Sequence, residues 1–457
     1  MSAGSTRLPP RVVVAGVSSG VGKTTVATGL MAALRARGLR VTSAKVGPDF
    51  IDPGYHALAT GRPGRNLDAW ISGADALPGL AARAGEGADV LVVEGVMGMF
   101  DGAGDGTPSS TASVAALLGA PVLLVVDASA MSGSVAAVVH GFATFDDAVQ
   151  VAGVVLNRVG SDGHEAMLRD ALAPLGVPVL GALRRDDALT WRDRHLGLVP
   201  VVEQPREVAA ALDRLASSVA TSVDLEAVLG IARRAAVVEA GAVAAPQRVG
   251  RARIAVASGP AFGFVYRDNV EALASAGAEL VPFDPFEDPS LPEAVGGLYV
   301  GGGFPEVFVE RLAANRPLLA DVRTKVDHGL VTWAECGGLL WLARSLDGAA
   351  MVGAVDAEGH MTEKLTIGYR GVTVSRANPI GPAGALLRGH EFHHSTTDPL
   401  GSALELRAAR GAGRAGFATS TLVASYVHLH LGASPEVAER FVRLAGSAGG
   451  TSASSPT

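Results

Sequence analysis

Short apolar runs alternate with helical patterns along the first half of the chain. Runs rich in Val and Leu have the length of buried strands, and segments such as 25–36 between them repeat apolar residues at helical spacing. The expected strands are 11–17, 39–45, 88–95, 120–128 and 151–158. Strands this apolar are buried on both faces, which predicts a parallel sheet covered by helices on both sides.

The alternation stops and then starts again, which predicts two domains. Between 237 and 251 the chain consists mainly of small residues with one Pro and no period. A second set of expected strands follows at 253–259, 278–284, 296–303, 329–336 and 422–431. We expect a first domain at 1–240, a linker at 241–250, a second domain at 251–445 and a disordered Gly/Ser-rich tail at 446–457.

Composition narrows the class of protein. Hydrophobic residues make up 48% of the 457 residues, enough for two or three cores, and the formal charge of −7 argues against a basic nucleic-acid-binding surface. The single cysteine, Cys336, cannot form an internal disulfide. The N-terminus lacks the apolar segment of a signal peptide, and apolar runs such as 122–126 stop well short of the ~20 residues that span a bilayer. We expect a soluble, cytoplasmic protein with no nucleic-acid or membrane partner.

Residues 16–25 (GVSSGVGKTT) predict a phosphate-binding loop between a strand and a helix. Backbone amides of Gly20 and Gly22 can wrap a phosphate, Lys23 can reach the β- and γ-phosphates, and Thr24 can offer its hydroxyl to Mg²⁺. Thr25 completes the predicted ATP-binding set. Five residues rather than four separate Gly16 from Gly22, a variant that resembles the loops of dethiobiotin synthetase and its relatives. Partition-type ATPases share this style of loop, but their signature lysine would stand in place of Ser18.

Further polar residues are expected at the carboxyl ends of the neighbouring strands. Lys45 is assigned to the nucleotide, and Asp49 and Glu94 join Thr24 as candidate Mg²⁺ ligands. Asn157 is a candidate for adenine recognition. The remaining candidates, expected to bind substrate, are Asp52, His56 and Asp101. The alternative without a functional role is that the 45–56 segment is a Pro/Gly turn with solvated charges.

Cys336 lies in a pattern of strand, sharp turn and helix. A helix N-terminus favours thiolate over thiol, so Cys336 is predicted to be a nucleophile. A lone cysteine is more often a small core residue, but the flanking Glu335 and Gly337-Gly338 argue against burial. Amides of the 301–303 glycine run are candidates for an oxyanion hole, with Gly302 and Gly303 assigned to substrate binding.

Two histidines close the last expected strand. In an extended segment His428 and His430 share a face, so one can serve Cys336 as a base while the other packs or binds substrate. A second cluster, His390, His393 and His394, has no cysteines nearby and is not predicted to bind zinc.

Taken in order, these segments resemble the cobyrinic/hydrogenobyrinic acid a,c-diamide synthase family. The likeness covers nearly the whole chain, and the motifs that carry it are SSGVGKTT, KVGPDFIDPGYH, NLDAWI, EGVMGMFDG, RHLGLVP, AFGFVYRDN, GGGFPE, WAECGG, GHEFHHS and SYVHLH. The resemblance implies two three-layer αβα domains with mostly parallel sheets. The first is a P-loop NTPase-like domain, and the second is a flavodoxin-like class I glutamine amidotransferase domain.

The resemblance also implies a reaction in two halves. ATP·Mg²⁺ phosphorylates a carboxylate of a corrin, and Cys336 releases ammonia from L-glutamine through a thioester; ammonia then displaces phosphate to give an amide, at side chains a and c. His428 matches the family's activating histidine. In the wider amidotransferase pattern a glutamate follows that histidine by two positions, but here His430 occupies that place, so the third member of the triad is open.

Two other functions remain as alternatives. One is a sister enzyme, cobyric acid synthase, which acts on other corrin carboxylates. The other is a P-loop switch protein whose amidotransferase-like domain is a non-catalytic binding module, against which the intact Cys336 and His428 argue. The sequence leaves open the presence of cobalt in the corrin and the oligomeric state, with a homodimer among the candidates.

Overall fold

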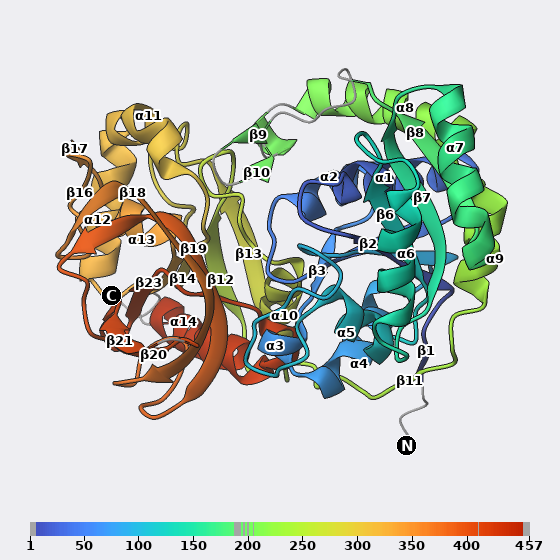
Figure 1. The fold of residues 1–457 in the computed structure, drawn as a ribbon. Coiled ribbons are helices and arrows are strands. Elements are labelled where there is room, and N and C mark those ends of the chain that lie inside the picture. The colour runs from blue at the N-terminus through green and yellow to red at the C-terminus, as the bar shows by residue number, and fades with distance from the viewer. Residues whose placement is uncertain are drawn as a thin grey trace. The chain divides into compact units, whose positions relative to one another are not determined.

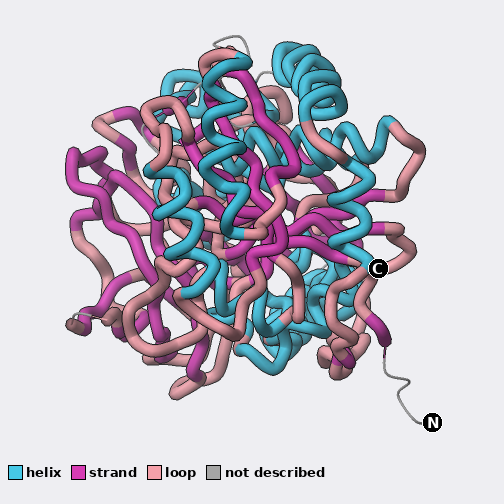
Figure 2. The backbone as a smooth tube through the Cα atoms, turned by 45° about the vertical axis from the view of Figure 1, so that its right-hand side comes forward, coloured by secondary structure: helices cyan, strands magenta, loops and turns pink. Residues whose placement is uncertain are grey.

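The computed structural model describes residues 6–186, 193–194, 197–198, 201–203, 205–409 and 411–450. The chain divides into two compact units, Met1–Val243 and Ala244–Thr457. The division falls within the segment 241–250 that the sequence analysis assigned to a linker, and this segment contains no helix or strand. Helices flank strands in both units (Figure 2).

Unit 1 is built around a parallel sheet. In the described residues the sheet has seven strands in the order β4-β3-β5-β2-β6-β7-β8. Their bounds are β2 Arg11–Gly16, β3 Val41–Val46, β4 Arg65–Leu67, β5 Val90–Glu94, β6 Val122–Asp127, β7 Val151–Val159 and β8 Val179–Arg184. The five strands expected in this half are all present. The short β4 and β8 were not predicted.

Helices cover both faces of this sheet (Figure 1), whose two sides carry separate hydrophobic cores. Valines of neighbouring positions, such as Val12 and Val13, belong to opposite cores, as strand alternation requires. The helices are α1 Lys23–Ala36, α2 Asp52–Thr60, α3 Ala69–Ser72, α4 Leu77–Ala84, α5 Thr111–Leu117, α6 Ser134–Thr144, α7 Asp162–Leu172, α8 Pro205–Ser222 and α9 Leu225–Arg233. Two short ladders complete the unit, β1 Thr6–Arg7 with β11 Glu239–Ala240 and β9 Asp193–Arg194 with β10 Gly197–Leu198. The remainder of the RHLGLVP motif lies outside the described residues.

Unit 2 contains a second mostly parallel sheet, in the order β13-β12-β14-β15-β23-β22 among the described residues. The strands are β12 Ala252–Ala257, β13 Ala278–Phe283, β14 Gly297–Val300, β15 Val331–Glu335, β22 Phe417–Ala418 and β23 Leu422–Ser425. The helices are α10 Arg267–Ala276, α11 Val309–Ala314, α12 Arg316–Asp327, α13 Gly337–Leu342 and α14 Pro435–Gly450. The two faces again carry separate cores, which confirms the predicted α/β class.

A mostly antiparallel sheet that the sequence analysis did not predict is added to unit 2. Its strands are β16 Ser345–Leu346, β17 Ala349–Ala350, β18 Glu358–Val374, β19 Leu386–Asp398, β20 Leu404–Arg407, β21 Ala412–Ala415 and β24 His428–Leu429. The single strand expected at 422–431 is therefore wrong. The segment leaves the parallel sheet after Ser425 and joins β19 at His428, because its backbone finds hydrogen-bonding partners in both sheets.

The predicted tail also begins too early. Helix α14 runs through Gly450, past the Gly446 boundary, while 451–457 lie outside the described residues. Ala445 is fully buried, and a Cβ on Gly446 would lie 2.9 Å from the carbonyl oxygen of Arg251. Packing of the apolar helix face against the sheet thus outweighs the low helix propensity of the glycines.

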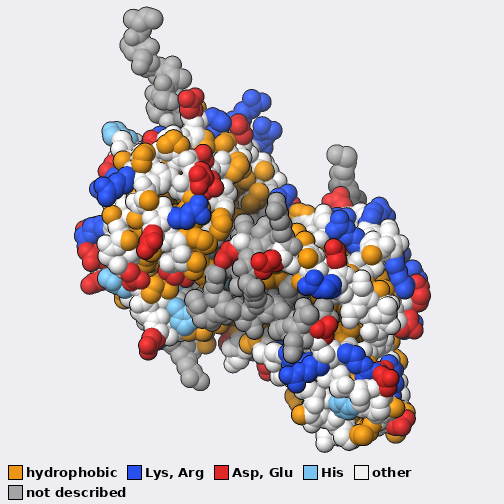
Figure 3. All heavy atoms as spheres, turned by 90° about the horizontal axis from the view of Figure 1, so that it is seen from above, with side chains coloured by type: hydrophobic (Ala, Val, Ile, Leu, Met, Phe, Trp, Pro, Cys, Tyr) orange, Lys and Arg blue, Asp and Glu red, His pale blue; other side chains and the backbone are white. Residues whose placement is uncertain are grey.

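Two further observations concern the surface charges and the length of the apolar helices. On the face seen in Figure 3, acidic and basic side chains are interspersed rather than gathered by sign. None of the helices that the structure describes is both long enough and apolar enough to cross a bilayer.

Candidate active sites

The glycine loop of unit 1 joins β2 to α1. Gly20 and Gly22 have φ values of 76° and 94°, a region that glycine enters without the strain of a Cβ. Lys23 opens the helix, and its Nζ donates to the carbonyl oxygen of Ser18 (3.0 Å). Burial, followed by the nearby Lys45, lowers the pKa of Lys23 to about 8. The amine is still mostly charged at neutral pH, and a phosphate in this loop would raise its pKa again.

A buried charge cluster lies at the carboxyl ends of β3 and β5. Strand register pairs Lys45 with Glu94, and Lys45 Nζ lies 2.8 Å from Glu94 Oε1 and 2.6 Å from Asp52 Oδ2. Burial alone would lower the pKa of Lys45, but Asp52 and Glu94 raise it above its ordinary value. Burial opposes ionisation of Glu94 as well, yet Lys45 and His56 lower its pKa. The pair therefore stays ionised.

Thr24 connects this cluster to the loop. Its hydroxyl donates to Glu94 Oε1 (2.6 Å) and lies 3.4 Å from Asp52 Oδ2. Burial, followed by Asp49, raises the pKa of Asp52. Two carboxylates and one hydroxyl are hard oxygen donors of the kind Mg²⁺ prefers. Among the described residues no group of three His, Cys, Asp or Glu side chains is arranged to hold a metal by itself.

Two predicted ligands make other contacts. Asp49, assigned to Mg²⁺, accepts the backbone amides of Ile51 and Asp52 at its Oδ1 (2.7 and 3.0 Å), just before α2 begins, and its role at Mg²⁺ stays a prediction. His56, assigned to substrate, is fully buried, with Nε2 2.5 Å from Glu94 Oε2. Its burial excludes direct contact with a large substrate. That assignment is corrected, because the helical spacing from Asp52 turns His56 into the cluster and not toward solvent.

Other predicted residues surround the loop. Thr25 lies in the first turn of α1. Asp101 is exposed, closes a turn by accepting the amide of Gly98 (2.8 Å) and acts electrostatically on Lys23. Asn157 donates to the carbonyl oxygen of Val21 (2.8 Å), and so holds the loop, a contact the sequence analysis did not predict. Its role at adenine stays a prediction.

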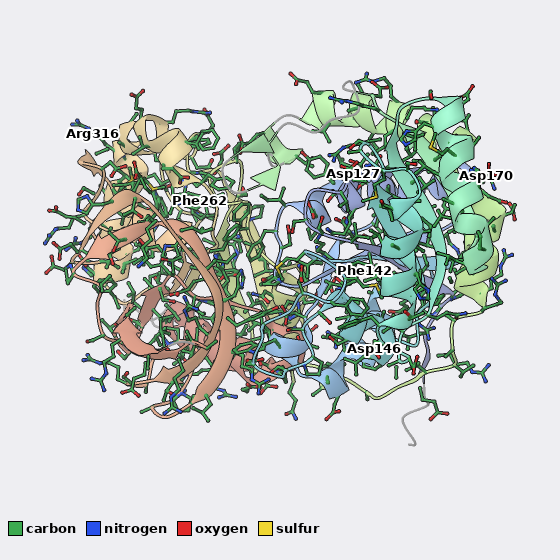
Figure 4. The ribbon with its side chains drawn as sticks, viewed as in Figure 1. Asp127, Phe142, Asp146, Asp170, Phe262 and Arg316 are labelled. Carbon is green, nitrogen blue, oxygen red and sulfur yellow. The ribbon has the colours of Figure 1, made fainter. Side chains whose placement is uncertain are left out.

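In unit 2, Cys336 occupies the turn between β15 and α13. It has φ of 49°, a strained value for a residue with a Cβ, and its amide donates to the carbonyl oxygen of Ser425 (2.7 Å). Figure 4 labels Phe262, whose ring packs on Trp341 of α13 with centroids 5.5 Å apart. The surrounding core thus holds the turn in its strained conformation.

The thiol is not the thiolate that the sequence analysis expected. Only 6% of Cys336 is exposed, and burial, followed by the Glu306 carboxylate, raises the pKa of its thiol. The Gly337 amide acts in the opposite direction but is outweighed. Desolvation of a sulfur anion costs more than the field of the six-residue α13 returns, so a base must remove the proton.

The glycine run of 301–303 packs close to His428 and to Gly337, the residue after Cys336. A Cβ on Gly302 would lie 2.4 Å from His428 Cε1, and a Cβ on Gly337 would lie 3.0 Å from the Gly303 amide nitrogen. The Gly302 amide already donates to the carbonyl oxygen of Phe264 (3.1 Å), so its predicted oxyanion role is wrong. In the described part of the chain the Gly303 amide makes no backbone hydrogen bond and remains available.

The two predicted catalytic histidines lie beside different carboxylates. Nδ1 of His428 lies 3.7 Å from Glu335 Oε2, whereas Nε2 of His430 lies 3.6 Å from Asp268 Oδ2 on α10. His430 Nδ1 also accepts the Gly432 amide (3.3 Å). His430 therefore belongs to a different network from His428.

The 389–395 cluster belongs to the same region as His428. His390 pairs with His428 across β19 and β24, and their rings stack with centroids 5.0 Å apart. His393 stacks on Tyr426 at 3.8 Å. The sequence analysis kept this cluster apart because nothing in the local pattern signals that β19 and β24 pair.

Comparisons with known proteins identify the two domains. Residues 12–199 match the model of the CobQ/CobB/MinD/ParA nucleotide binding domain, and residues 253–436 match that of the CobB/CobQ-like glutamine amidotransferase domain. A hydrogenobyrinate a,c-diamide synthase of Streptomyces coelicolor is 48% identical over 95% of this chain and 97% of its own. That of Thermobifida fusca is 47% identical (94% and 96%), and a cobyrinate a,c-diamide synthase of Synechococcus sp. is 41% identical (94% and 97%). The chain therefore belongs to the hydrogenobyrinate/cobyrinate a,c-diamide synthase family, as its motifs predicted.

Proposed function

We propose that this protein amidates the a and c carboxylates of hydrogenobyrinic or cobyrinic acid, and consumes one ATP and one glutamine for each amide. The observation that carries the proposal is that one chain, similar to these synthases over 95% of its length, contains both a phosphate loop with a buried acidic cluster and a cysteine in a strained turn. Neither site alone would account for both the activation of a carboxylate and the supply of ammonia.

The unit 1 site activates the carboxylate. A corrin carboxylate oxygen attacks the γ-phosphorus of ATP, the bond to the bridging oxygen breaks, and ADP leaves. Amides of Gly20 and Gly22 and the amine of Lys23 bind the phosphates. Thr24, Asp52 and Glu94 would hold Mg²⁺, which supplies charge neutralisation at the phosphates. Lys45 and His56 keep Glu94 ionised and oriented. Asp101, exposed beside the loop, is our candidate for contact with the corrin.

The unit 2 site releases ammonia. His428 accepts the proton of Cys336, and the sulfur attacks the carboxamide carbon of glutamine. The Gly303 and Gly337 amides stabilise the oxyanion. Collapse of the intermediate expels ammonia and leaves a glutamyl thioester, which water hydrolyses. Ammonia then attacks the acyl phosphate and displaces phosphate, so that a carboxamide forms.

Incubation with ATP, Mg²⁺, amide-¹⁵N-glutamine and each corrin tests the substrate. We expect mass spectrometry to show two ¹⁵N-labelled amides on hydrogenobyrinic or cobyrinic acid, with ADP and glutamate formed in equal amounts. A product only from a corrin that already carries the a and c amides would favour the cobyric acid synthase alternative. Glutamine hydrolysis without labelled corrin from either acid would contradict the proposed substrate.

Gly302→Ala tests the packing of the base. The added Cβ would lie 2.4 Å from His428 Cε1, so the imidazole must move from its present position. We expect glutamine-dependent amidation to fall at least about 10-fold, because small displacements of a catalytic group cost one to two orders of magnitude. Amidation with ammonium chloride should be unchanged. Gly413→Ala, where a Cβ meets no atom within 4 Å, is the matched control; equal losses in both variants would contradict the expectation.

A further inference from the structure

The family resemblance leaves the activating histidine without its usual carboxylate, since His430 occupies the position two residues after His428. We propose that Glu335, the residue immediately before the nucleophile, supplies this carboxylate and positions His428. This inference rests on the proposed glutamine reaction and assigns one further residue to it.

Glu335 is built into the site from its own strand. It ends β15, is 1% exposed, and its Oε2 lies 3.7 Å from Nδ1 of His428. That separation is longer than a hydrogen bond. Catalytic hydrogen bonds are often long in the absence of substrate and tighten only when it binds. The nitrogen that faces Glu335 is Nδ1, which leaves Nε2 to take the proton from the thiol.

Two donors fix the orientation of the Glu335 carboxylate, and a third, Asn269, holds the segment beside it. Oε1 accepts the backbone amide of Leu429 (3.0 Å), the residue after the histidine, and Oε2 accepts the Tyr299 hydroxyl (3.2 Å). Burial, followed by Glu335, raises the pKa of Tyr299, so this hydroxyl stays protonated and donates. Asn269 binds both the hydroxyl of Tyr299 (3.3 Å) and the carbonyl oxygen of Leu429 (2.7 Å). The carboxylate and the histidine are thus held by one network.

The other charged groups near His428 do not fit this role. Glu391 is paired with Arg370 (2.6 Å), so its charge is balanced. Asp268 faces His430 instead. On the ring face of His428 lies His390, whose pKa is lowered by burial and by His428 and His430, so it stays neutral. Glu335 is therefore the carboxylate in place to stabilise an imidazolium at His428.

The proton balance of the step is simple. The Sγ–H proton of Cys336 moves to Nε2 of His428 while the sulfur electron pair forms the bond to the glutamine carbonyl carbon. Nδ1–H then donates to Glu335, whose negative charge stabilises the cation. When the tetrahedral intermediate collapses, the Nε2 proton passes to the departing ammonia. Glu335 exchanges no proton in this step and acts through His428, so it is a positioning residue.

Glu335→Gln tests the assignment, with Asp268→Asn as its matched control. Each variant replaces one buried carboxylate, 3.6–3.7 Å from one buried histidine of the same segment, by its isosteric amide. For Glu335→Gln we expect kcat for glutamine hydrolysis to fall on the order of 10²-fold, as for loss of assistance to a general base. The KM for glutamine should change less than about threefold, since this residue acts through His428. Asp268→Asn should keep kcat within about fivefold.

Two further measurements separate positioning from folding. Amidation with ammonium chloride and the unfolding midpoint should match the wild type in both variants. Glu335→Asp, which keeps the charge, should recover at least about a tenth of the wild-type kcat. Equal kcat losses in Glu335→Gln and Asp268→Asn, or Glu335→Asp no better than Glu335→Gln, would overturn the assignment. If the wild type hydrolyses glutamine and Glu335→Gln keeps its full kcat, Glu335 alone is misassigned; a wild type that amidates with ammonia but never hydrolyses glutamine overturns the proposed function itself.

Discussion

Lys23→Ala is expected to abolish amidation with both nitrogen sources. Both nitrogen sources react with the same acyl phosphate. Without the Lys23 amine the loop loses the positive charge that would bind the β- and γ-phosphates. We expect the rate of ADP formation and of amide formation to fall by about 10³-fold, in line with removal of one preorganised charge from a transition state. The measurement is product mass and ADP in parallel reactions with glutamine and with ammonium chloride.

The same variant should leave the unit 2 reaction intact. Glutamine hydrolysis measured without corrin should stay within a few-fold of wild type, because Lys23 lies in a separate compact unit. Lys364→Ala removes an exposed lysine and is the matched control, for which no change is expected. Retention of ammonia-dependent amidation in Lys23→Ala would contradict the role of the loop in forming the acyl phosphate.

Cys336→Ala is expected to separate the two nitrogen sources. With glutamine, amidation should fall at least about 10³-fold, since removing a covalent nucleophile costs several orders of magnitude. With ammonium chloride it should persist, because free ammonia replaces the product of the unit 2 reaction. Both rates are measured on the same preparation, together with glutamate release.

The structural reading of Cys336 makes a different prediction for this variant. The side chain is 6% exposed and packs in a hydrophobic core, so a purely structural cysteine would cost stability on truncation. Loss of amidation with both nitrogen sources, along with a lower unfolding midpoint, would support that reading. A selective loss with an unchanged midpoint supports the nucleophile.

Local patterns carried much of the prediction. The loop at residues 16–25 and the turn at Cys336 are each formed by consecutive residues. Glycines at positions that need a positive φ can therefore be recognised without knowledge of the rest of the chain. Likewise the short Val-rich runs identify buried strands, which is why the sheet of unit 1 agrees with expectation. The family follows from the order of these motifs and is confirmed by the full-length relatives.

At the sites, the predictions that changed were those that depended on burial and on contacts between distant residues. A helix N-terminus suggested a thiolate at Cys336, but burial of the sulfur outweighs that field and keeps the thiol protonated. Spacing alone made His428 and His430 equivalent, yet one faces Glu335 and the other Asp268. Burial also moved His56 from the substrate to Glu94.

By itself the sequence determined the two α/β units and predicted the phosphate loop and the nucleophile, since each depends on periodicity or on neighbours along the chain. Only the tertiary structure decided which side chains contact one another at each site. Lys45 meets Glu94 through strand register across 49 positions, and Glu335 meets the segment of His428 across 94. Protonation depends on distances in space and on exclusion of water, and neither is encoded in a local pattern.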